Sequence, residues 1–184
     1  MKYILKPLQE PFSELASAIF AKYPKGKDGY IIQLFRVFAN SDRFLKGKGV
    51  VGLLDKESPL SIREREIVIL RVTANLNCEY EWGVHVSAFS KAAELDDKQI
   101  AATRLSAPVV DCWTKRDQLL LKSVDDLCSN AQIQLPHYDT FQNTWNLEQQ
   151  LEIFALCGNY HTVSFIANTT RLDPEDTSAK FPSN

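Results

Sequence analysis

A helix-starting pattern recurs along this chain and constrains its fold more than any other feature. The clearest copy is Ser61-Ile62-Arg63-Glu64. Its serine oxygen can accept a hydrogen bond from a free amide of the first helical turn, while the glutamate reaches back to the serine amide. Residues 96–99 repeat the pattern, and residues 114–117 and 146–149 open further helices. Strict alternation of apolar and polar residues, the mark of strands, is hard to find, so we expect an all-helical fold.

The helix predicted to start at Ser61 is apolar on more than one side, which indicates a central place in the core. It is expected to end at residues 75–77, where either asparagine can cap the next helix, expected from Cys78 to about Ala93. Further helices are predicted over residues 12–23 and 30–40, from residues 96 and 114, and from residue 146 to about 170.

The composition is that of a folded domain. The chain has 184 residues, 45% hydrophobic and 24% charged, which is the ordinary globular mix. We expect a single domain over residues 1–172, with its core at about 30–172. Residues 173–184 are rich in Pro, Ser, Asp and Thr and have little to bury, so they are expected to form a loosely ordered tail.

Charge and hydropathy exclude several classes of partner. Lys and Arg number 21 and Asp and Glu number 23, a formal net charge of −2 without the basic excess of a nucleic-acid-binding surface. The N-terminal residues hold no apolar run long enough for a secretory signal, and no stretch approaches the ~18 apolar residues of a membrane helix. We therefore expect a cytoplasmic protein that binds neither nucleic acid nor membrane.

The densest chemical patch is Cys78-Glu79-Tyr80-Glu81-Trp82-Gly83-Val84-His85. Cys78, Glu81 and His85 stand at i, i+3 and i+7 and share one helical face, so Glu81 can orient or charge the imidazole of His85. A position in the first turn lowers the pKa of a thiol. Glu66, Glu79 and Glu81 oppose this by repulsion, which leaves the sign of the shift open.

Simpler interpretations of these residues remain open. Glu81 and His85 can be a solvated helix pair, and a cysteine on an apolar helix is usually packing, which we expect of Cys112, Cys128 and Cys157. The four cysteines are few and widely spaced, so they are predicted to be thiols. A zinc site at Cys78, Glu81 and His85 would have three ligands where a structural site needs four, and we predict no metal and no cofactor.

The segment from Leu60 to Val72, followed by Cys78-Glu79-Tyr80-Glu81-Trp82 and His85-Val86, resembles the carboxymuconolactone decarboxylase family, which includes alkylhydroperoxidase D. The resemblance extends over about 30–172. It implies an alkylhydroperoxidase D-like fold built on a central helical hairpin, usually assembled as trimers or hexamers. In the peroxidase branch a glutamate precedes a Cys-x-x-Cys pair and a histidine; Glu66, Cys78 and His85 match, and Glu81 replaces the peroxide-attacking cysteine.

Two activities follow from this resemblance. The first is thiol-dependent peroxide reduction, with Cys78 as redox thiol, His85 and Glu66 as its proton relay and Glu81 tuning the histidine. The decarboxylase branch has a glutamate four residues before the histidine, which implies decarboxylation or a related proton transfer on a small carboxylated lactone by Glu81 and His85. Such a substrate needs Arg63, Arg65 or Arg71 nearby. A non-catalytic oligomeric binding protein is the third hypothesis.

Overall fold

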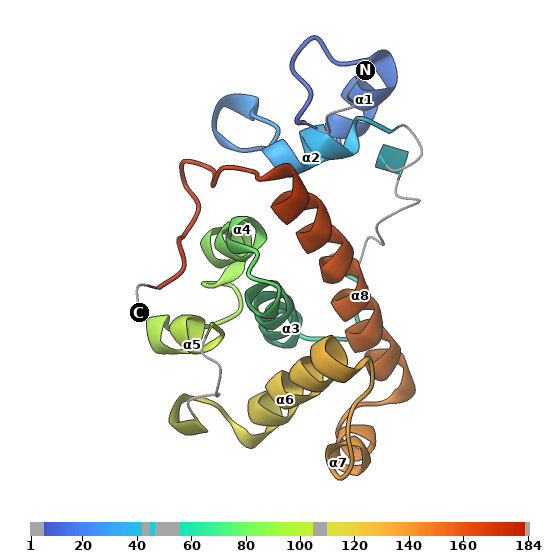
Figure 1. Cartoon of the computed structure of the whole chain (residues 1–184), viewed down its shortest axis with the longest axis vertical. Coiled ribbons are helices and arrows are strands. Elements are labelled where there is room, and N and C mark those ends of the chain that lie inside the picture. Colours follow the sequence, from blue (N-terminus) through green and yellow to red (C-terminus); the bar gives the residue numbers. More distant parts are fainter. Residues whose placement is uncertain (1–5, 42–44, 47–55, 105–109, 183–184) are drawn as a thin grey trace.

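The computed structural model describes residues 6–41, 45–46, 56–104 and 110–182. Within this part of the chain it contains helices and turns but no strands, so the all-helical prediction is confirmed (Figure 1). In chain order the elements are α1 (Glu14–Phe20), the short 3₁₀ turn η1 (Lys27–Gly29), α2 (Gln33–Phe38), α3 (Ile62–Asn75), α4 (Glu79–Phe89), α5 (Asp97–Ala102), the 3₁₀ turn η3 (Val110–Cys112), α6 (Lys115–Asn130), α7 (His137–Thr144) and α8 (Leu147–Thr170).

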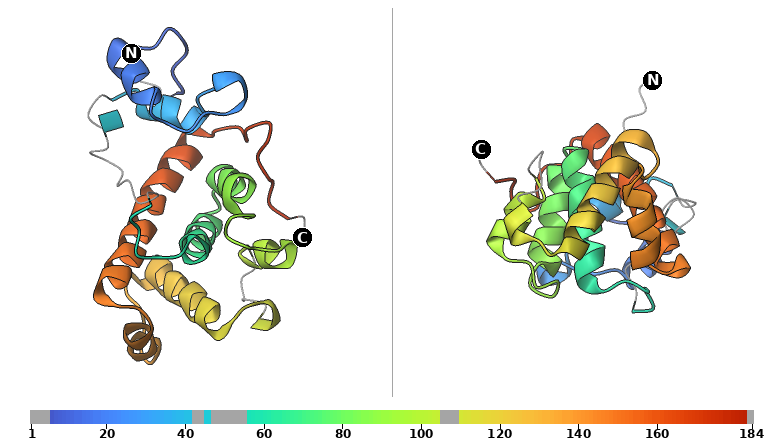
Figure 2. Two further views of the ribbon diagram at one scale, coloured as in Figure 1. Left: turned by 180° about the vertical axis from the view of Figure 1, so that it is seen from behind. Right: turned by 90° about the horizontal axis from the view of Figure 1, so that it is seen from below.

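Helix α3 lies at the centre of the fold, as the sequence predicts. It contacts α4, α6 and α8, and the left view of Figure 2 shows it between these helices. All its residues from Glu64 to Ala74 are buried. At its start the hydroxyl of Ser61 accepts a hydrogen bond from the amide of Glu64, and the carboxylate of Glu64 accepts one from the amide of Ser61. The predicted capping box is therefore confirmed.

The other helix starts are equally local in origin. Asp96, Thr114 and Asn146 each cap a helix through a reciprocal bond with the residue three positions on, and α8 ends at Thr170, as predicted. The two N-terminal helices are shorter than the predicted 12–23 and 30–40. Aromatic residues such as Phe12 and Tyr23 prolong the apolar spacing, but they pack onto the core from loops rather than from helical turns.

Helices α3 and α4 form the central hairpin that the family resemblance implies. The amide of Cys78 donates to the carbonyl of Thr73 (2.8 Å), which closes the end of α3, and Asn77 turns the chain in a left-handed conformation (φ 52°). Cys78 itself is the N-cap of α4, so the prediction of an asparagine cap is wrong. The helix begins at Glu79 and ends at Phe89, four residues before the predicted end at Ala93.

Residues 173–182 run along α4 in place of the loosely held tail that composition predicts (Figure 1). We call this segment the tail. Its Glu175 accepts hydrogen bonds from the amide of Gln33 (2.8 Å) and the hydroxyl of Tyr80. The amide of Ala179 donates to the carbonyl of Gly83, and a Cβ atom at Gly83 would stand 2.1 Å from the carbonyl oxygen of Ala179. A glycine on α4 therefore makes room for backbone contacts that composition does not register.

Candidate active site

His85 lies buried at the point where α3, α4 and α8 meet. Its Nδ1 atom is 2.8 Å from Oε2 of Glu66 on α3. Its Nε2 atom is 3.0 Å from the hydroxyl of Tyr160 on α8 and 3.4 Å from Oε1 of Glu81, one turn earlier on α4. Three helices thus hold one imidazole ring from both of its nitrogen atoms.

Two carboxylates keep this imidazole protonated at neutral pH. Burial by itself lowers the pKa of His85, but the charges and hydrogen bonds of Glu66 and Glu81 act in the opposite direction and raise it to about 9. The ring therefore donates one N–H to Glu66 and offers the other to Glu81 and Tyr160. A buried imidazolium of this kind can act as a proton donor to a reacting group.

The same two carboxylates each have one oxygen atom left over. Oε1 of Glu66 and Oε2 of Glu81 are buried, and neither has a hydrogen-bond partner in the part of the chain that the structure describes. Buried polar atoms are almost always bonded, so such atoms call for an explanation by a ligand or by function. Because a carboxylate oxygen only accepts, the group that completes this site must be a hydrogen-bond donor.

Cys78 lies beside this cluster and is fully buried. Burial raises the pKa of its thiol, and the charge of Glu81 raises it further. The backbone amide of Glu81 and the nearby hydroxyl of Ser164 act in the opposite direction, but more weakly. Glu79 accepts a hydrogen bond from the amide of Phe181 in the tail (2.8 Å). The net shift in the pKa of Cys78, whose direction the sequence left open, is therefore upward, and the thiol is harder to ionise than usual.

The structure brings together all four predicted residues, Glu66, Cys78, Glu81 and His85, and adds two from α8. Sequence reasoning missed Tyr160 and Ser164, although their buried neighbours on α8 share one helical face with them. That periodicity, read without the fold, shows only that these side chains face the core. The Nδ1–H group of His161 donates to the carbonyl of Cys157 on its own helix (2.8 Å), and His161 lies apart from the site.

The remaining cysteines form no disulfide and pack in or against the hydrophobic core. Cys157 is buried, and its pKa is raised well above the ordinary value by burial and by the neighbouring Cys128. Burial also raises the pKa of Cys128. Cys157 thus resembles Cys78 in burial but has no acid or imidazole among the groups that shift its pKa, which makes it a useful internal comparison.

The described residues contain neither a metal-binding cluster nor a membrane-spanning helix. No group of three or more His, Cys, Asp or Glu side chains is placed to hold a metal ion there. Among the same residues, no helix combines the length and the apolar character that crossing a bilayer requires.

Comparison with known proteins supports the predicted resemblance. Residues 48–120 match the model of the Carboxymuconolactone decarboxylase family, and this range holds Glu66, Cys78, Glu81 and His85. A crystal structure of an uncharacterized peroxidase-related protein from Silicibacter sp. TM1040 has the same fold, with a TM-score of 0.72, 18% sequence identity and 96% of each chain covered. No curated protein matches the chain. Over residues 48–120 the chain is thus similar to the carboxymuconolactone decarboxylase family, which confirms the resemblance inferred from its sequence.

Proposed function

We propose that this protein reduces organic hydroperoxides, with Cys78 as the reacting thiol and with His85, Glu66 and Glu81 as its proton relay. The observation that carries this proposal is a pair of carboxylate oxygens, on Glu66 and Glu81, that have no hydrogen-bond partner among the described residues and flank an imidazolium next to a thiol. The match of residues 48–120 to the family model supports this proposal, and the likeness in fold to a peroxidase-related protein is consistent with it.

A hydroperoxide fits this site better than a carboxylated lactone does. Its terminal O–H is a donor without charge, and it can bond to the spare oxygen of Glu81. A lactone acid would bring acceptors and negative charge to a site that already holds two carboxylates. Two of the three arginines that could balance such a charge are engaged elsewhere, since Arg63 pairs with Asp117 and Arg71 with Asp125.

The reaction balances with the groups present and one external reductant. Cys78 gives its proton to Glu81, and the thiolate attacks the terminal oxygen of the peroxide. The S–O bond forms as the O–O bond breaks, and the departing alkoxide takes a proton from the imidazolium of His85. Glu81 returns the thiol proton to His85, so the products are an alcohol and a sulfenic acid at Cys78. A small thiol condenses with the sulfenic acid and releases water, and a second thiol restores Cys78 as it leaves in a disulfide.

The test is oxidation of the intact protein by one equivalent of cumene hydroperoxide in the presence of a sulfenic acid trap. Peptide mapping then compares the four cysteines. We expect the trap on Cys78 and not on Cys157, which is just as buried, and we expect Cys78→Ser to abolish peroxide consumption. Equal, slow labelling of all four thiols, or full peroxide consumption by Cys78→Ser, would overturn the proposal.

A proton-transfer reaction is the second candidate, and the burial of Cys78 favours it. A fully buried thiol with a raised pKa is a poor nucleophile, whereas His85, with a pKa of about 9, is a ready proton donor. In this case Glu81 is the base and Cys78 only lines the site. Release of CO₂ from carboxylated lactones by Cys78→Ser at the wild-type rate would support this candidate. Neither reaction in either protein would favour the non-catalytic binding protein.

We also propose that copies of this chain associate through the outer side of α8. Leu147, Leu151 and Phe165 are 79%, 68% and 60% exposed there. Together with Phe154, Gly158 and His161 they form a stripe whose spacing alternates between four and three residues, the pattern by which helices pack together. Trimers or hexamers, which the family resemblance implies, would bury this stripe. Sedimentation equilibrium gives the number of copies, and a monomer would refute the proposal.

A further inference from the structure

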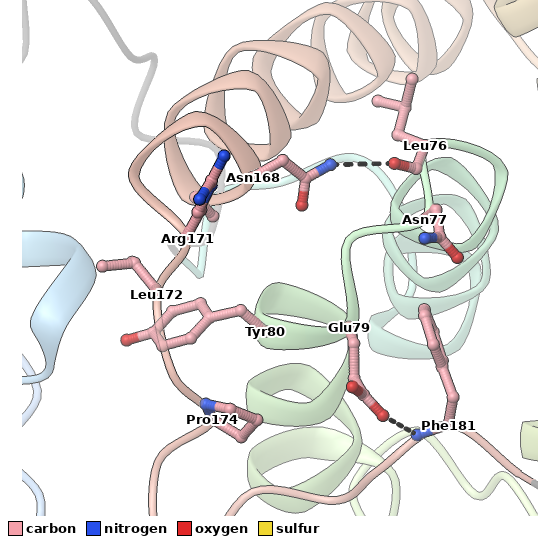
Figure 3. A pocket seen from close by; sticks show the side chains of 10 residues that line it. Leu76, Asn77, Glu79, Tyr80, Asn168, Arg171, Leu172, Pro174 and Phe181 are labelled. Carbon is pink, nitrogen blue, oxygen red and sulfur yellow. Dashed lines mark hydrogen bonds between the residues drawn. The ribbon is translucent and has the colours of Figure 1, made fainter.

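A cavity of about 490 Å³ opens where the first turn of α4, the end of α8 and the tail meet (Figure 3). Its volume lies within the roughly 300–1,000 Å³ of ordinary small-molecule sites. Neither Cys78 nor His85 lines it, so it is separate from the candidate active site. The lining residues are Leu76, Asn77, Glu79, Tyr80, Ala167, Asn168, Arg171, Leu172, Pro174 and Phe181.

The cavity nevertheless adjoins the buried thiol from two sides. Asn77 and Glu79, which line it, are the sequence neighbours of Cys78 on either side. On α8, Asn168 lines the cavity four residues after Ser164, whose hydroxyl lies near enough to Cys78 to lower the pKa of its thiol. Four residues of helix span roughly 6 Å. A molecule in the cavity therefore lies about one helical turn from the thiol.

The charged groups in and beside the cavity differ in whether they already bond to other groups of the fold. Glu79 accepts the amide of Phe181, and Arg104, which stacks on the ring of Phe181, donates to Asn77 (2.7 Å). Arg171 is exposed, and among the described residues its guanidinium makes no hydrogen bond or ion pair. In Figure 3 Arg171 and Asn168 stand on the α8 wall, across the opening from Glu79. The cavity thus offers one positive charge that is not neutralised within the fold.

Beside this charge the cavity has mixed walls, in which apolar side chains stand next to the polar Asn77, Glu79 and Asn168. Leu172 and Pro174 lie one and three positions after Arg171, and Leu76 and Phe181 lie on the far side (Figure 3). A guanidinium beside apolar side chains at the rim of a cavity can bind a carboxylate attached to a hydrocarbon chain, because the charge stays at the water boundary and the chain packs on the apolar part of the wall.

We propose that this cavity binds amphipathic carboxylates, with the carboxylate on Arg171 and the hydrocarbon chain against Leu172, Pro174 and Phe181. Joined to the proposed function, on which this part rests, the substrates are hydroperoxides of medium-chain carboxylic acids. Their negative charge would stay at Arg171, away from Glu66 and Glu81, while the neutral peroxide group would lie against Asn77 and Glu79, the chain neighbours of Cys78. The tail, which supplies Pro174 and Phe181, is then part of a substrate site.

Binding of decanoate and of decanol to the purified full-length chain, measured by calorimetry, tests this site without any peroxide. We expect decanoate to bind at least about tenfold more tightly than decanol to the wild type, the size of one charge-assisted contact. Arg171→Asn should remove that preference, since asparagine tolerates the left-handed backbone at this position (φ 51°). Arg171→Lys should keep part of it, and Lys98→Asn, which removes an exposed charge on α5, should leave it unchanged.

The outcomes separate this inference from the proposed function. If decanoate does not bind, binds no better than decanol, or binds Arg171→Asn as tightly as the wild type, the carboxylate site is overturned whatever the peroxide assay shows. If Arg171 is required for decanoate binding but Cys78 resists oxidation, the site stands and the peroxide chemistry falls. If both hold, Arg171→Asn should raise KM about tenfold for a carboxylated hydroperoxide and leave kcat, and the KM for cumene hydroperoxide, unchanged.

Discussion

Two glutamates on α3, only two positions apart, have opposite surroundings. Glu64 has no oxygen left over: Oε1 accepts from Arg116 and from the indole of Trp145 (2.7–2.9 Å), and Oε2 accepts from the amide and hydroxyl of Ser61. Burial raises the pKa of Glu64, but these donors outweigh it and the net pKa is lowered. Glu64 joins the start of α3 to α6 and to Trp145, the residue that ends α7.

Glu66 is more deeply buried and less well satisfied. One of its oxygens bonds to His85, which it shares with Glu81, and the other has no partner among the described residues. The comparison teaches that burial of a charge does not by itself mark a functional site. An acid whose lone pairs are all used holds helices together, whereas an acid with a spare oxygen beside an imidazolium is prepared to meet a ligand.

The largest effects expected from this comparison are a loss of stability in Glu64→Gln and a loss of activity in Glu66→Gln. Glu64→Gln puts an amide N–H against Arg116 or Ser61 and should lower the free energy of unfolding by about 2–3 kcal/mol. Glu66→Gln should lower the free energy of unfolding by less than half of that amount. It should slow oxidation of Cys78 by about 100-fold, because the proton relay loses the negative charge of Glu66. Urea denaturation and stopped-flow peroxide consumption measure the two quantities. Equal stability losses in both variants would remove the distinction.

The surroundings of the two glutamates also differ in how they make stability depend on pH: at Glu66 the group that titrates is its partner His85, and at Glu64 it is the carboxylate itself. The pKa of His85 is raised from 6.5 to about 9 by folding, so its contribution is complete below pH 6.5 and is lost as the pH rises through 9. The pKa of Glu64 is lowered from 4.5, so its contribution is complete above that pH and is lost as the pH falls through the lowered value.

Replacing His85 or Glu64 by glutamine should therefore reduce the change in stability with pH, on the alkaline side for His85 and on the acid side for Glu64. His85→Gln is expected to reduce the loss of stability between pH 6.5 and about 8.5, a window below the ordinary pKa of 9.0 for the Cys78 thiol, whose pKa is also raised. Glu64→Gln should reduce only the loss below pH 4.5. Urea unfolding at a series of pH values measures both limbs. An alkaline limb that persists in His85→Gln would show that another group controls it.

The smallest expected effect belongs to Tyr160, which touches the relay without carrying charge in it. Its hydroxyl lies 3.0 Å from Nε2 of His85, and burial raises its pKa well above the ordinary value, so it remains neutral. Tyr160→Phe should slow oxidation of Cys78 by about tenfold, with a stability loss of about 1 kcal/mol. Ser123→Ala, which removes a buried hydroxyl on α6, is the matched control and should not change the rate.

The sequence by itself determined most helix starts and four of the residues that meet at the site. Capping boxes involve residues three apart, so Ser61, Asp96 and Asn146 could be read without knowing the fold. The pairing of Glu81 with His85 follows from one helical turn, and Glu66 followed from the family resemblance. The capping boxes and the Glu81–His85 pair could be predicted because they depend only on backbone geometry within a few residues.

The tertiary structure alone decided how those residues behave. Tyr160 and Ser164 reach the site from α8, about eighty positions along the chain from Cys78, and no local pattern registers that meeting. The raised pKa of Cys78 and the spare oxygen of Glu66 depend on how much water and how many donors the surrounding helices leave. Burial and hydrogen-bond satisfaction are sums over distant parts of the chain, and only packing fixes them.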